Sequence, residues 1–267
     1  MSRLPCKSRF IRIGNVGVDS FLRFSPLNTI IQSLGAANYW LSSRSRQLKF
    51  DLFTSLMKPW PGCSILNLGA APPHMGGTLM HAASNRIEQP EQDARWRKFR
   101  VVGSNLNGED MQRYKRDYRA CGFQAVIADG CRLPFPDQSF DVVFSNAVIE
   151  HLTPEGQQSM ANEILRVGRS WFVTTPNFWY PIEMHHKLPL FQFLPRSVQE
   201  RIRRRYHTWP DGEPINLLTG RKIARLLPGS RVLKTRITFF PETLIAFCPP
   251  GERRRGEHPA GAVRLFA

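Results

Sequence analysis

The chain of 267 residues is 42% hydrophobic, which is enough apolar sequence to bury a sizeable core and excludes a wholly disordered protein. Its 37 Lys and Arg against 21 Asp and Glu give a formal charge of +16, so its surface attracts nucleic acid, anionic lipid or acidic substrates. Its five cysteines are scattered and form no Cys-x-x-Cys pair, which argues against a disulfide scaffold or a structural zinc site and favours a reducing compartment.

Short apolar runs recur along the middle of the chain. Residues 1–25 show no clear periodicity, the spacing turns helical between Pro26 and Met57, and the Pro- and Gly-containing stretch 58–62 ends that helix. Helix-capable sequence separates most of the five runs that follow, a rhythm typical of a parallel sheet wrapped on both faces. The predicted strands are Ser64–Leu68, Arg100–Gly103, Ala125–Ala128, Phe140–Ser145 and Trp171–Thr175.

Two further β-rich runs, Arg231–Phe240 and Thr243–Cys248, lie close together near the end of the chain. The link between them is too short for a crossover helix, so the two strands should pair antiparallel as a hairpin. We therefore expect an α/β fold with a doubly wound, mainly parallel sheet and a C-terminal antiparallel hairpin. An N-terminal segment with helices over residues 1–60 precedes it, and a basic tail over residues 251–267 is expected to be disordered.

Ligands of such a sheet bind beyond the carboxyl ends of its strands. Small residues follow the first strand at Gly69–Ala71 and allow a close approach of backbone and ligand. Polar segments follow the next three strands and begin at Ser104, Asp129 and Asn146. The first loop is neither Gly-x-Gly-x-x-Gly nor a P-loop, which argues against a nicotinamide dehydrogenase.

The order of these segments, and above all Leu133–Leu152, resembles the class I S-adenosylmethionine-dependent methyltransferases, in particular the small-molecule type with a methyltransferase-11-like domain. The resemblance covers about Ser64 to Asn177. It implies a Rossmann-like, seven-stranded sheet over residues 61–250 that the final hairpin closes. It also implies S-adenosyl-L-methionine as the cofactor and a substrate cap over about residues 177–230.

The same resemblance implies a set of cofactor-binding residues, with two departures from the family pattern. Asn67 stands where the family usually has an acidic residue, and Asn105 stands where an Asp or Glu accepts hydrogen bonds from the ribose hydroxyls. An amide oxygen still accepts, but without the assistance of a charge. Asp129 matches the acid that binds the adenine amino group. The implied residues are Asn67, Gly69, Ala70, Ala71, Asn105, Leu106, Asp129, Gly130, Cys131, Ser145 and Asn146.

Three histidines are candidate catalytic residues. His151 follows the fourth strand, and His185 and His186 lie in an aromatic-rich stretch that forms the substrate wall in the family. Because a sulfonium already activates its methyl group, the protein has to place the acceptor, exclude water and take at most one proton, which a histidine can do. Structural roles, in holding the loop or packing against it, remain the alternative for each. No cluster has metal-ligand spacing, so no metal is expected.

The function we expect is methyl transfer from S-adenosylmethionine to a small-molecule, sugar or lipid-linked acceptor. The charge of +16 keeps open an RNA or protein methyltransferase of the same fold. Against nucleic acid, no Asn-Pro-Pro-Tyr-like motif follows the fourth strand, and no basic groove with stacking residues is evident. A non-catalytic binding protein on this fold is the third alternative, because both Asn departures weaken the expected cofactor contacts.

An apolar stripe edged by arginines lies in the expected cap. Its four residues are spaced by three, four and four, which predicts one helical face, and Pro195 limits any helix here to starting near it. They are Phe191, Leu194, Val198 and Ile202, and the arginines are Arg196, Arg201, Arg203, Arg204 and Arg205. Such a helix either faces the core or forms a lid against an anionic membrane or a phosphate-linked acceptor. Without a spanning segment or a signal peptide, we expect a cytoplasmic protein, with peripheral membrane contact in the second case.

Overall fold

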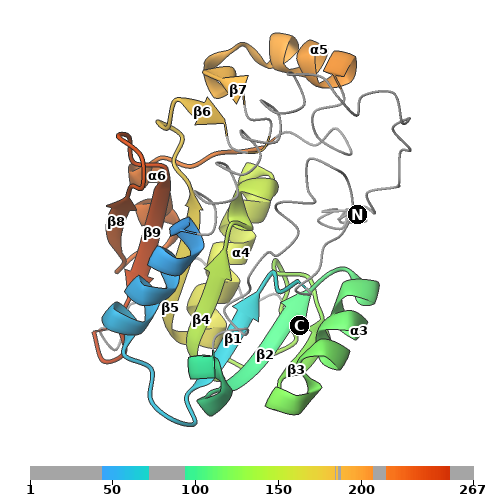
Figure 1. Cartoon of the computed structure of the whole chain (residues 1–267), viewed down its shortest axis with the longest axis vertical. Helices are drawn as coiled ribbons and strands as arrows, with labels where there is room; N and C mark the ends of the chain where they lie inside the picture. Colours follow the sequence, from blue (N-terminus) through green and yellow to red (C-terminus); the bar gives the residue numbers. More distant parts are fainter. Residues whose placement is uncertain (1–43, 72–93, 184, 186–187, 207–214, 253–267) are drawn as a thin grey trace, which may run out of the picture.

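The computed structural model of the chain describes residues 44–71, 94–183, 185, 188–206 and 215–252. The centre of this part is a seven-stranded sheet with the strand order β3-β2-β1-β4-β5-β9-β8 (Figure 1). The strands are β1 (Ser64–Leu68), β2 (Arg100–Asn105), β3 (Gln124–Ile127), β4 (Phe140–Asn146), β5 (Gly168–Pro176), β8 (Arg231–Thr235) and β9 (Thr243–Cys248). The five predicted parallel strands are confirmed, with ends within three residues of those expected.

The pairing of the strands confirms a mainly parallel sheet closed by an antiparallel hairpin. The first five strands pair in parallel, β9 pairs antiparallel with β5, and β8 pairs antiparallel with β9. The prediction that the first strand of the hairpin reaches Phe240 is wrong, because β8 ends at Thr235. Beyond it, the backbone N–H of Ile237 donates to the carboxylate of Glu242 at 3.0 Å. This N–H is therefore not available for a hydrogen bond to β9, which a longer strand would require.

Helices cover both faces of the sheet, as the alternation of strand and helix predicted. They are helix 44–57, η3 (Ala94–Lys98), α3 (Gly108–Asp117), η4 (Arg119–Cys121), η5 (Ile149–His151), α4 (Pro154–Val167), η6 (Phe191–Phe193), α5 (Arg196–Tyr206) and α6 (Gly220–Leu226). A separate antiparallel pair is formed by β6 (Ile182–Glu183) and β7 (Leu188–Pro189).

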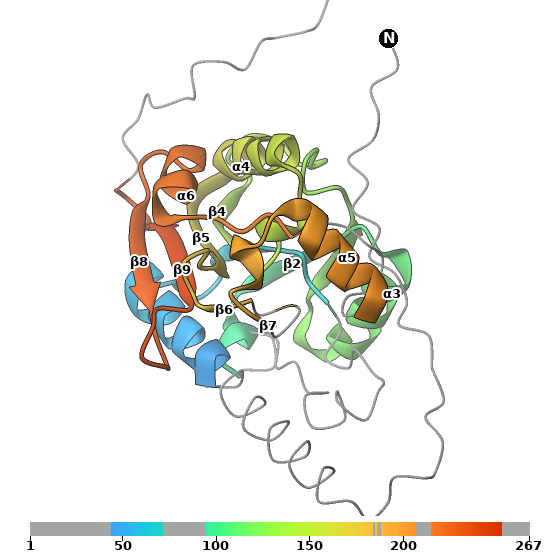
Figure 2. The same cartoon turned by 90° about the horizontal axis from the view of Figure 1, so that it is seen from above.

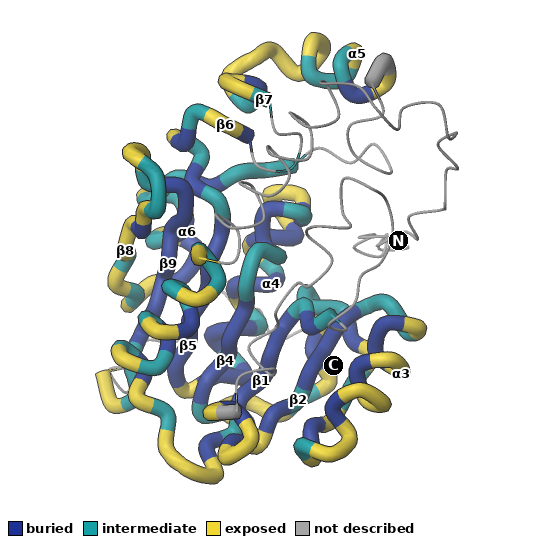
Figure 3. The backbone as a smooth tube through the Cα atoms, in the orientation of Figure 1, coloured by how far each residue is buried: buried dark blue, intermediate teal, exposed yellow. Residues whose placement is uncertain are grey.

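Two hydrophobic clusters form the core, one on each face of the sheet. Phe53 of helix 44–57 and Tyr114 of α3 pack with Phe144 of β4 on one face. Ile164 of α4 and its neighbours pack with Val143 of β4 on the other. Val143 and Phe144 are therefore buried on opposite faces, which explains why the central strands are mainly apolar and are buried along most of their length (Figure 3). Helix 44–57 belongs to the same core as the strands.

Side-chain caps fix the residues at which α3 and α4 begin. Asn107 precedes α3, and its Oδ1 accepts hydrogen bonds from the backbone N–H groups of Glu109 at 3.0 Å and Asp110 at 3.2 Å. Thr153 precedes α4, and its Oγ1 accepts from the N–H of Gly156 at 3.2 Å. These caps follow β2 and η5 directly, so they hold the strand-end segments that carry the candidate site.

The elements β6, β7, η6 and α5 stand over the carboxyl ends of the parallel strands (Figures 1 and 2). The expected helix start near Pro195 is confirmed, but the prediction that Phe191 and Leu194 share its apolar face is wrong. Phe191 lies in η6, Leu194 has an extended backbone with ψ of 150°, and α5 begins only at Arg196. Pro195 explains the break, because the residue before a proline avoids the helical conformation.

Several predictions concern residues outside those described. They are the unassigned stretch 1–25, the helical spacing before residue 44, the role of His186 and the tail beyond residue 252. Within the described ranges, no helix combines the length and the apolar character needed to cross a membrane.

Candidate active site

A cleft opens at the carboxyl ends of the central strands. Its lining comes from the segments that follow β1, β2 and β3, together with residues beside η5 and on α4. The lining residues are Leu68, Gly69, Ser104, Asn105, Leu106, Ala128, Asp129, Gly130, Cys131, Val148, Leu152 and Met160. Of the implied cofactor-binding residues, six are brought together here: Gly69, Asn105, Leu106, Asp129, Gly130 and Cys131.

Gly69 makes the tight turn at the end of β1. Its backbone φ is 83°, in the left-handed region that side-chain-bearing residues rarely adopt. A Cβ atom at this position would lie 2.2 Å from Cγ2 of Val148, which lines the cleft from the far side. The N–H groups of Gly69 and Ala70 both donate to the carbonyl of Ser104, at 2.7 and 3.1 Å, so the turn is tied to β2. Glycine is therefore required by backbone conformation and by space.

The side chain of Asn105 also stabilises the turn at Gly69. The side chain is buried, its Nδ2 donates to the carbonyl of Ala70 at 2.9 Å, and its Oδ1 accepts from the N–H of Asn107 at 3.3 Å. A carboxylate at this position has no proton to donate to Ala70. The departure from the family's acidic residue thus has a structural reason, which the sequence pattern did not reveal.

Asp129 forms a compact turn at the cleft's edge after β3. Its Oδ1 accepts from the N–H of Cys131 at 2.8 Å, and its carbonyl accepts from the N–H of Arg132 at 2.9 Å. Its second carboxylate oxygen has no hydrogen bond to any described residue. Asp129 can therefore hold the turn with one oxygen and accept a ligand's donor with the other.

The remaining implied residues do not line the described cleft. Asn67 and Ser145 are buried within β1 and β4, and Ala70 and Ala71 lie just past the turn of Gly69. Asn146 instead uses its Oδ1 to accept hydrogen bonds from Nζ of Lys49 at 3.2 Å and from Oγ1 of Thr174 at 2.7 Å.

A second group of polar residues lies beside the cleft, on and around η5. After β4 the chain passes through Ala147, whose φ of 56° is unusual for a residue other than glycine, and η5 then carries Glu150 and His151. The backbone carbonyl of Glu150 accepts from the N–H of Asn216 at 2.8 Å, and Nδ2 of Asn216 donates to the carbonyl of Leu152 at 3.0 Å. Asn216 thus braces η5 from the segment before α6.

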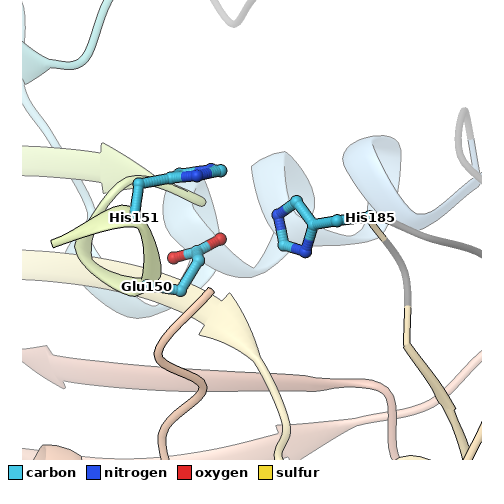
Figure 4. Close-up of side chains that lie close together, drawn as sticks. All are labelled: Glu150, His151 and His185. Carbon is cyan, nitrogen blue, oxygen red and sulfur yellow. The ribbon is translucent and has the colours of Figure 1, made fainter. Parts of the chain in front are cut away.

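His185 follows β6, in the segment that stands over the carboxyl ends of the strands, and its side chain lies next to η5. Ligand-type atoms of Glu150, His151 and His185 all lie within 4.8 Å of one another, and the two imidazole centroids are 4.9 Å apart (Figure 4). Nδ1 of His185 lies 2.7 Å from Oε1 of Glu183, and Oγ1 of Thr175 donates to Oε2 of Glu150 at 3.0 Å. The structure therefore brings two of the three predicted histidines together, and adds two carboxylates that the sequence reading missed.

The electrostatics of this cluster differ from residue to residue. Burial, together with the neighbouring His185, lowers the pKa of His151 to about 4, so its imidazole is neutral near pH 7. Burial opposes a charge on His185, but the hydrogen bond to Glu183 and the nearby Glu150 raise the pKa of His185 overall. Burial also raises the pKa of Glu150 and lowers that of Lys49 to about 8. The cluster is a site of perturbed groups beside a cleft, as active sites commonly are.

Comparison with known proteins identifies the family to which the central part is similar. Residues 89–170 match the family model described as "Methyltransferase domain". No curated protein matches the chain. This matched range contains β2 to the start of β5, and with them Asn105, Asp129 and His151.

Solved structures are similar to this chain at low sequence identity. The PH0226 protein of Pyrococcus horikoshii OT3 is 14% identical, with a TM-score of 0.49, over 78% of this chain and 91% of that one. A SAM-dependent methyltransferase of Methanosarcina mazei is 15% identical, with a TM-score of 0.46, over 70% and 92%. Phosphoethanolamine N-methyltransferase 2 of Haemonchus contortus, in complex with S-adenosyl-L-methionine, is 17% identical, with a TM-score of 0.46, over 71% of this chain and 38% of that longer one.

Proposed function

We propose that this chain is an S-adenosylmethionine-dependent methyltransferase, since residues 89–170 match a methyltransferase domain. In this proposal it methylates a hydroxyl group of a small-molecule, sugar or lipid-linked acceptor held between the strand-end cleft and the cap. The observation that carries the proposal is the position of the cluster formed by Glu150, His151 and His185. It adjoins Val148 and Leu152, which line the cleft, so a donor in the cleft and an acceptor at the cluster are neighbours.

The residues of the cleft fit S-adenosylmethionine. Gly69 turns the backbone sharply at the edge of the cleft, and the second carboxylate oxygen of Asp129 is open to a donor such as the adenine amino group. Ser104 lines the cleft, and its Oγ is buried and has no hydrogen-bond partner in the described part of the chain. We assign these residues, with Leu106, Gly130 and Cys131, to cofactor binding. In the same assignment Asn105 holds the first loop in place.

The cofactor supplies a methyl group on a positively charged sulfur, which needs no further activation. The chain's own residues then have three tasks: to align the acceptor with the methyl group, to exclude water, and to weaken the acceptor's O–H bond. We assign the first two to the aromatic residues of the cap, including Phe178, Trp179 and Phe193, whose rings contact one another. The third belongs to the cluster with His151 and His185.

The acceptor class is inferred from the cap. Large apolar side chains are exposed on it, with Trp179 at 63% and Leu190 at 55%, and α5 beside them carries several arginines. An apolar surface next to basic groups suits an acceptor with a hydrophobic part and a phosphate, presented at an anionic membrane surface. Peripheral membrane contact through this cap is part of the proposal.

Binding of S-adenosylhomocysteine is the first test. At a hundredfold excess over its dissociation constant, the ligand should stabilise the protein by about 2.7 kcal/mol, measured as a rise in melting temperature. Asp129→Ala should abolish the rise, whereas Asp117→Ala, at an exposed position on α3, should leave it unchanged. A wild-type protein that shows no rise at millimolar ligand contradicts the assignment of the cleft.

Methyl transfer to hydroxyl acceptors is the second test, followed as release of S-adenosylhomocysteine. His151→Gln and His185→Gln should keep the melting rise with S-adenosylhomocysteine and lose turnover by about 10²- to 10⁴-fold. Full turnover in both variants would show that the acceptor's proton leaves elsewhere, and that these histidines only support the fold.

A further inference from the structure

The cluster beside the cleft has the composition of a metal site, although its members are far apart in the sequence. Glu150 and His151 come from η5, and His185 comes from the turn after β6. Each offers one ligand atom, and these atoms lie within 4.8 Å of one another, with Glu150 and His185 pointing toward each other (Figure 4). Two imidazoles and one carboxylate are the ligand set of many catalytic zinc and non-haem metal sites.

Glu150 provides an independent sign that something is bound here. The residue is fully buried, and its Oε1 has no hydrogen-bond partner in the part of the chain that the structure describes. Nζ of Lys49, whose charge acts on Glu150, donates to Oδ1 of Asn146 at 3.2 Å. A buried carboxylate oxygen without a donor is costly, and a cation in contact with it removes that cost.

Residues behind the cluster are arranged as supports for metal ligands. Nδ1 of His185 meets Oε1 of Glu183 at 2.7 Å, and a carboxylate behind a histidine fixes the tautomer and the ring orientation of a metal-binding imidazole. The other oxygen of Glu150 accepts from Oγ1 of Thr175, which orients the carboxylate.

We propose that Glu150, His151 and His185 bind a divalent transition-metal ion, such as Zn²⁺, with Glu183 and Thr175 as positioning residues. Imidazole ligands favour a transition metal over Mg²⁺ or Ca²⁺, which prefer oxygen ligands. Three protein ligands leave a coordination position open, as in catalytic zinc sites. The inference rests on the proposed function, because the ion would then lie where the acceptor's hydroxyl group arrives.

In that position the ion would act as a Lewis acid on the acceptor. Contact with the ion would make the acceptor's O–H more acidic, and its proton would leave to solvent. The acceptor oxygen then forms a bond to the methyl carbon, and the carbon–sulfur bond breaks with its electron pair remaining on sulfur. The products are the methyl ether and the neutral thioether S-adenosylhomocysteine, so no oxidant or reductant is needed.

Metal binding is tested on the full chain, stripped with a chelator and free of any affinity tag. Co²⁺ is the probe, because its visible absorption reports the ligand geometry, and Zn²⁺ should displace it. We expect saturable binding at one ion per chain, without the intense thiolate band that coordination by Cys131 or another cysteine would give. Glu150→Gln, His151→Gln and His185→Gln should each weaken Co²⁺ binding at least about tenfold, and Glu183→Gln should weaken it by about 10- to 100-fold.

Two controls keep the result interpretable. Glu155→Gln, the same change at an exposed position on α4, should bind Co²⁺ like the wild type. The melting temperature of each variant in chelator shows whether it folds, and if Glu150→Gln does not fold, the histidine variants decide. Absent Co²⁺ binding, or binding that none of the ligand variants weakens, overturns the metal site.

The failure of the metal site is distinguishable from the failure of the proposed function. If S-adenosylhomocysteine binds and methyl transfer proceeds in chelator at the same rate, the methyltransferase assignment stands and the metal site is overturned. Loss of turnover in chelator that Zn²⁺ or Co²⁺ restores, with S-adenosylhomocysteine binding unchanged throughout, supports the metal site.

Discussion

Asn105→Asp separates two roles for the residue at the end of β2. The family resemblance makes an acid here a partner of the ribose, so the change should tighten cofactor binding. The structure instead shows Nδ2 of Asn105 donating to the carbonyl of Ala70 at 2.9 Å, from a side chain that is only 8% exposed. An aspartate places a carboxylate oxygen against that carbonyl, with no proton between them. We expect a loss of stability and weaker binding.

The magnitude follows from one broken buried hydrogen bond. Leaving a buried acceptor unsatisfied costs about 1–3 kcal/mol, and more where the replacing group is charged. The free energy of unfolding of Asn105→Asp should therefore fall by at least about 1–3 kcal/mol at neutral pH. At a pH low enough to protonate the new carboxyl group, its O–H can donate to Ala70 and the deficit should shrink.

Urea unfolding of matched variants is the assay. Asn107→Asp makes the same chemical change two residues away, where the side chain only accepts hydrogen bonds as the N-cap of α3. Asp and Asn cap helices about equally well, so this control should change the unfolding free energy by no more than a few tenths of a kcal/mol. If Asn105→Asp is as stable as Asn107→Asp and binds S-adenosylhomocysteine more tightly than the wild type, Asn105 faces the ribose and our account of it is wrong.

Three further predictions concern the turn, the sheet and the cap. Gly69→Ala should lower the free energy of unfolding in urea by at least about 2 kcal/mol, because residue 69 has a positive φ and a Cβ there would clash with Val148. Adding Val148→Ala to this variant should restore only the part of the loss that the clash causes. An unchanged urea midpoint in Gly69→Ala would refute the prediction. Burial raises the pKa of Asp141, but hydrogen bonds from Ser64 and Arg169 outweigh it and lower the pKa overall. The stabilising contribution of Asp141 is therefore present above the ordinary pKa of 3.8 and is lost as the pH falls through the folded-state pKa. The difference in unfolding free energy between the wild type and Asp141→Asn should shrink on acidification, and a difference independent of pH would contradict this account. The double variant Arg201→Gln and Arg204→Gln on α5 should bind anionic vesicles more weakly at low salt, by about 1 kcal/mol per charge at most, measured by sedimentation. Arg116→Gln on α3 should bind these vesicles like the wild type. Equal sedimentation of the wild type with neutral vesicles would exclude the proposed membrane contact.

The sheet was predictable because its central strands are buried on both faces. Runs such as Phe140–Ser145 are mainly apolar, and a parallel strand between two helical layers needs that composition. The hairpin was predictable from the length of one link. Its exact extent was not, because the strand stops where the side chain of Glu242 binds the backbone at Ile237. Apolar spacing likewise misled over the cap, where Pro195 outweighed the periodicity.

The candidate site was predictable only in part. Gly69, Asp129 and Cys131 follow strand ends, and the rule for doubly wound sheets places such residues at one edge. The cluster around Glu150 depends on contacts between η5, the turn after β6 and helix 44–57, and spacing in the sequence does not encode those contacts. A signal was present, since Glu150 precedes His151 directly after a strand. The sequence alone did not show that His185 would complete the group.

Three buried polar atoms without hydrogen-bond partners in the described part of the chain support placing both proposed ligands at the same edge of the sheet. Oγ of Ser104 lies near the end of β2, Oγ of Ser145 near the end of β4, and Oε1 of Glu150 on η5 just beyond. Such atoms lower stability unless something satisfies them, and apolar side chains would serve a purely structural role better. Their grouping where the strands end therefore favours bound ligands. Ser104 lines the cleft assigned to the cofactor, and Glu150 belongs to the cluster assigned to the ion. Leu152, which lines that cleft, directly follows His151 of the cluster, so the two proposed sites are neighbours.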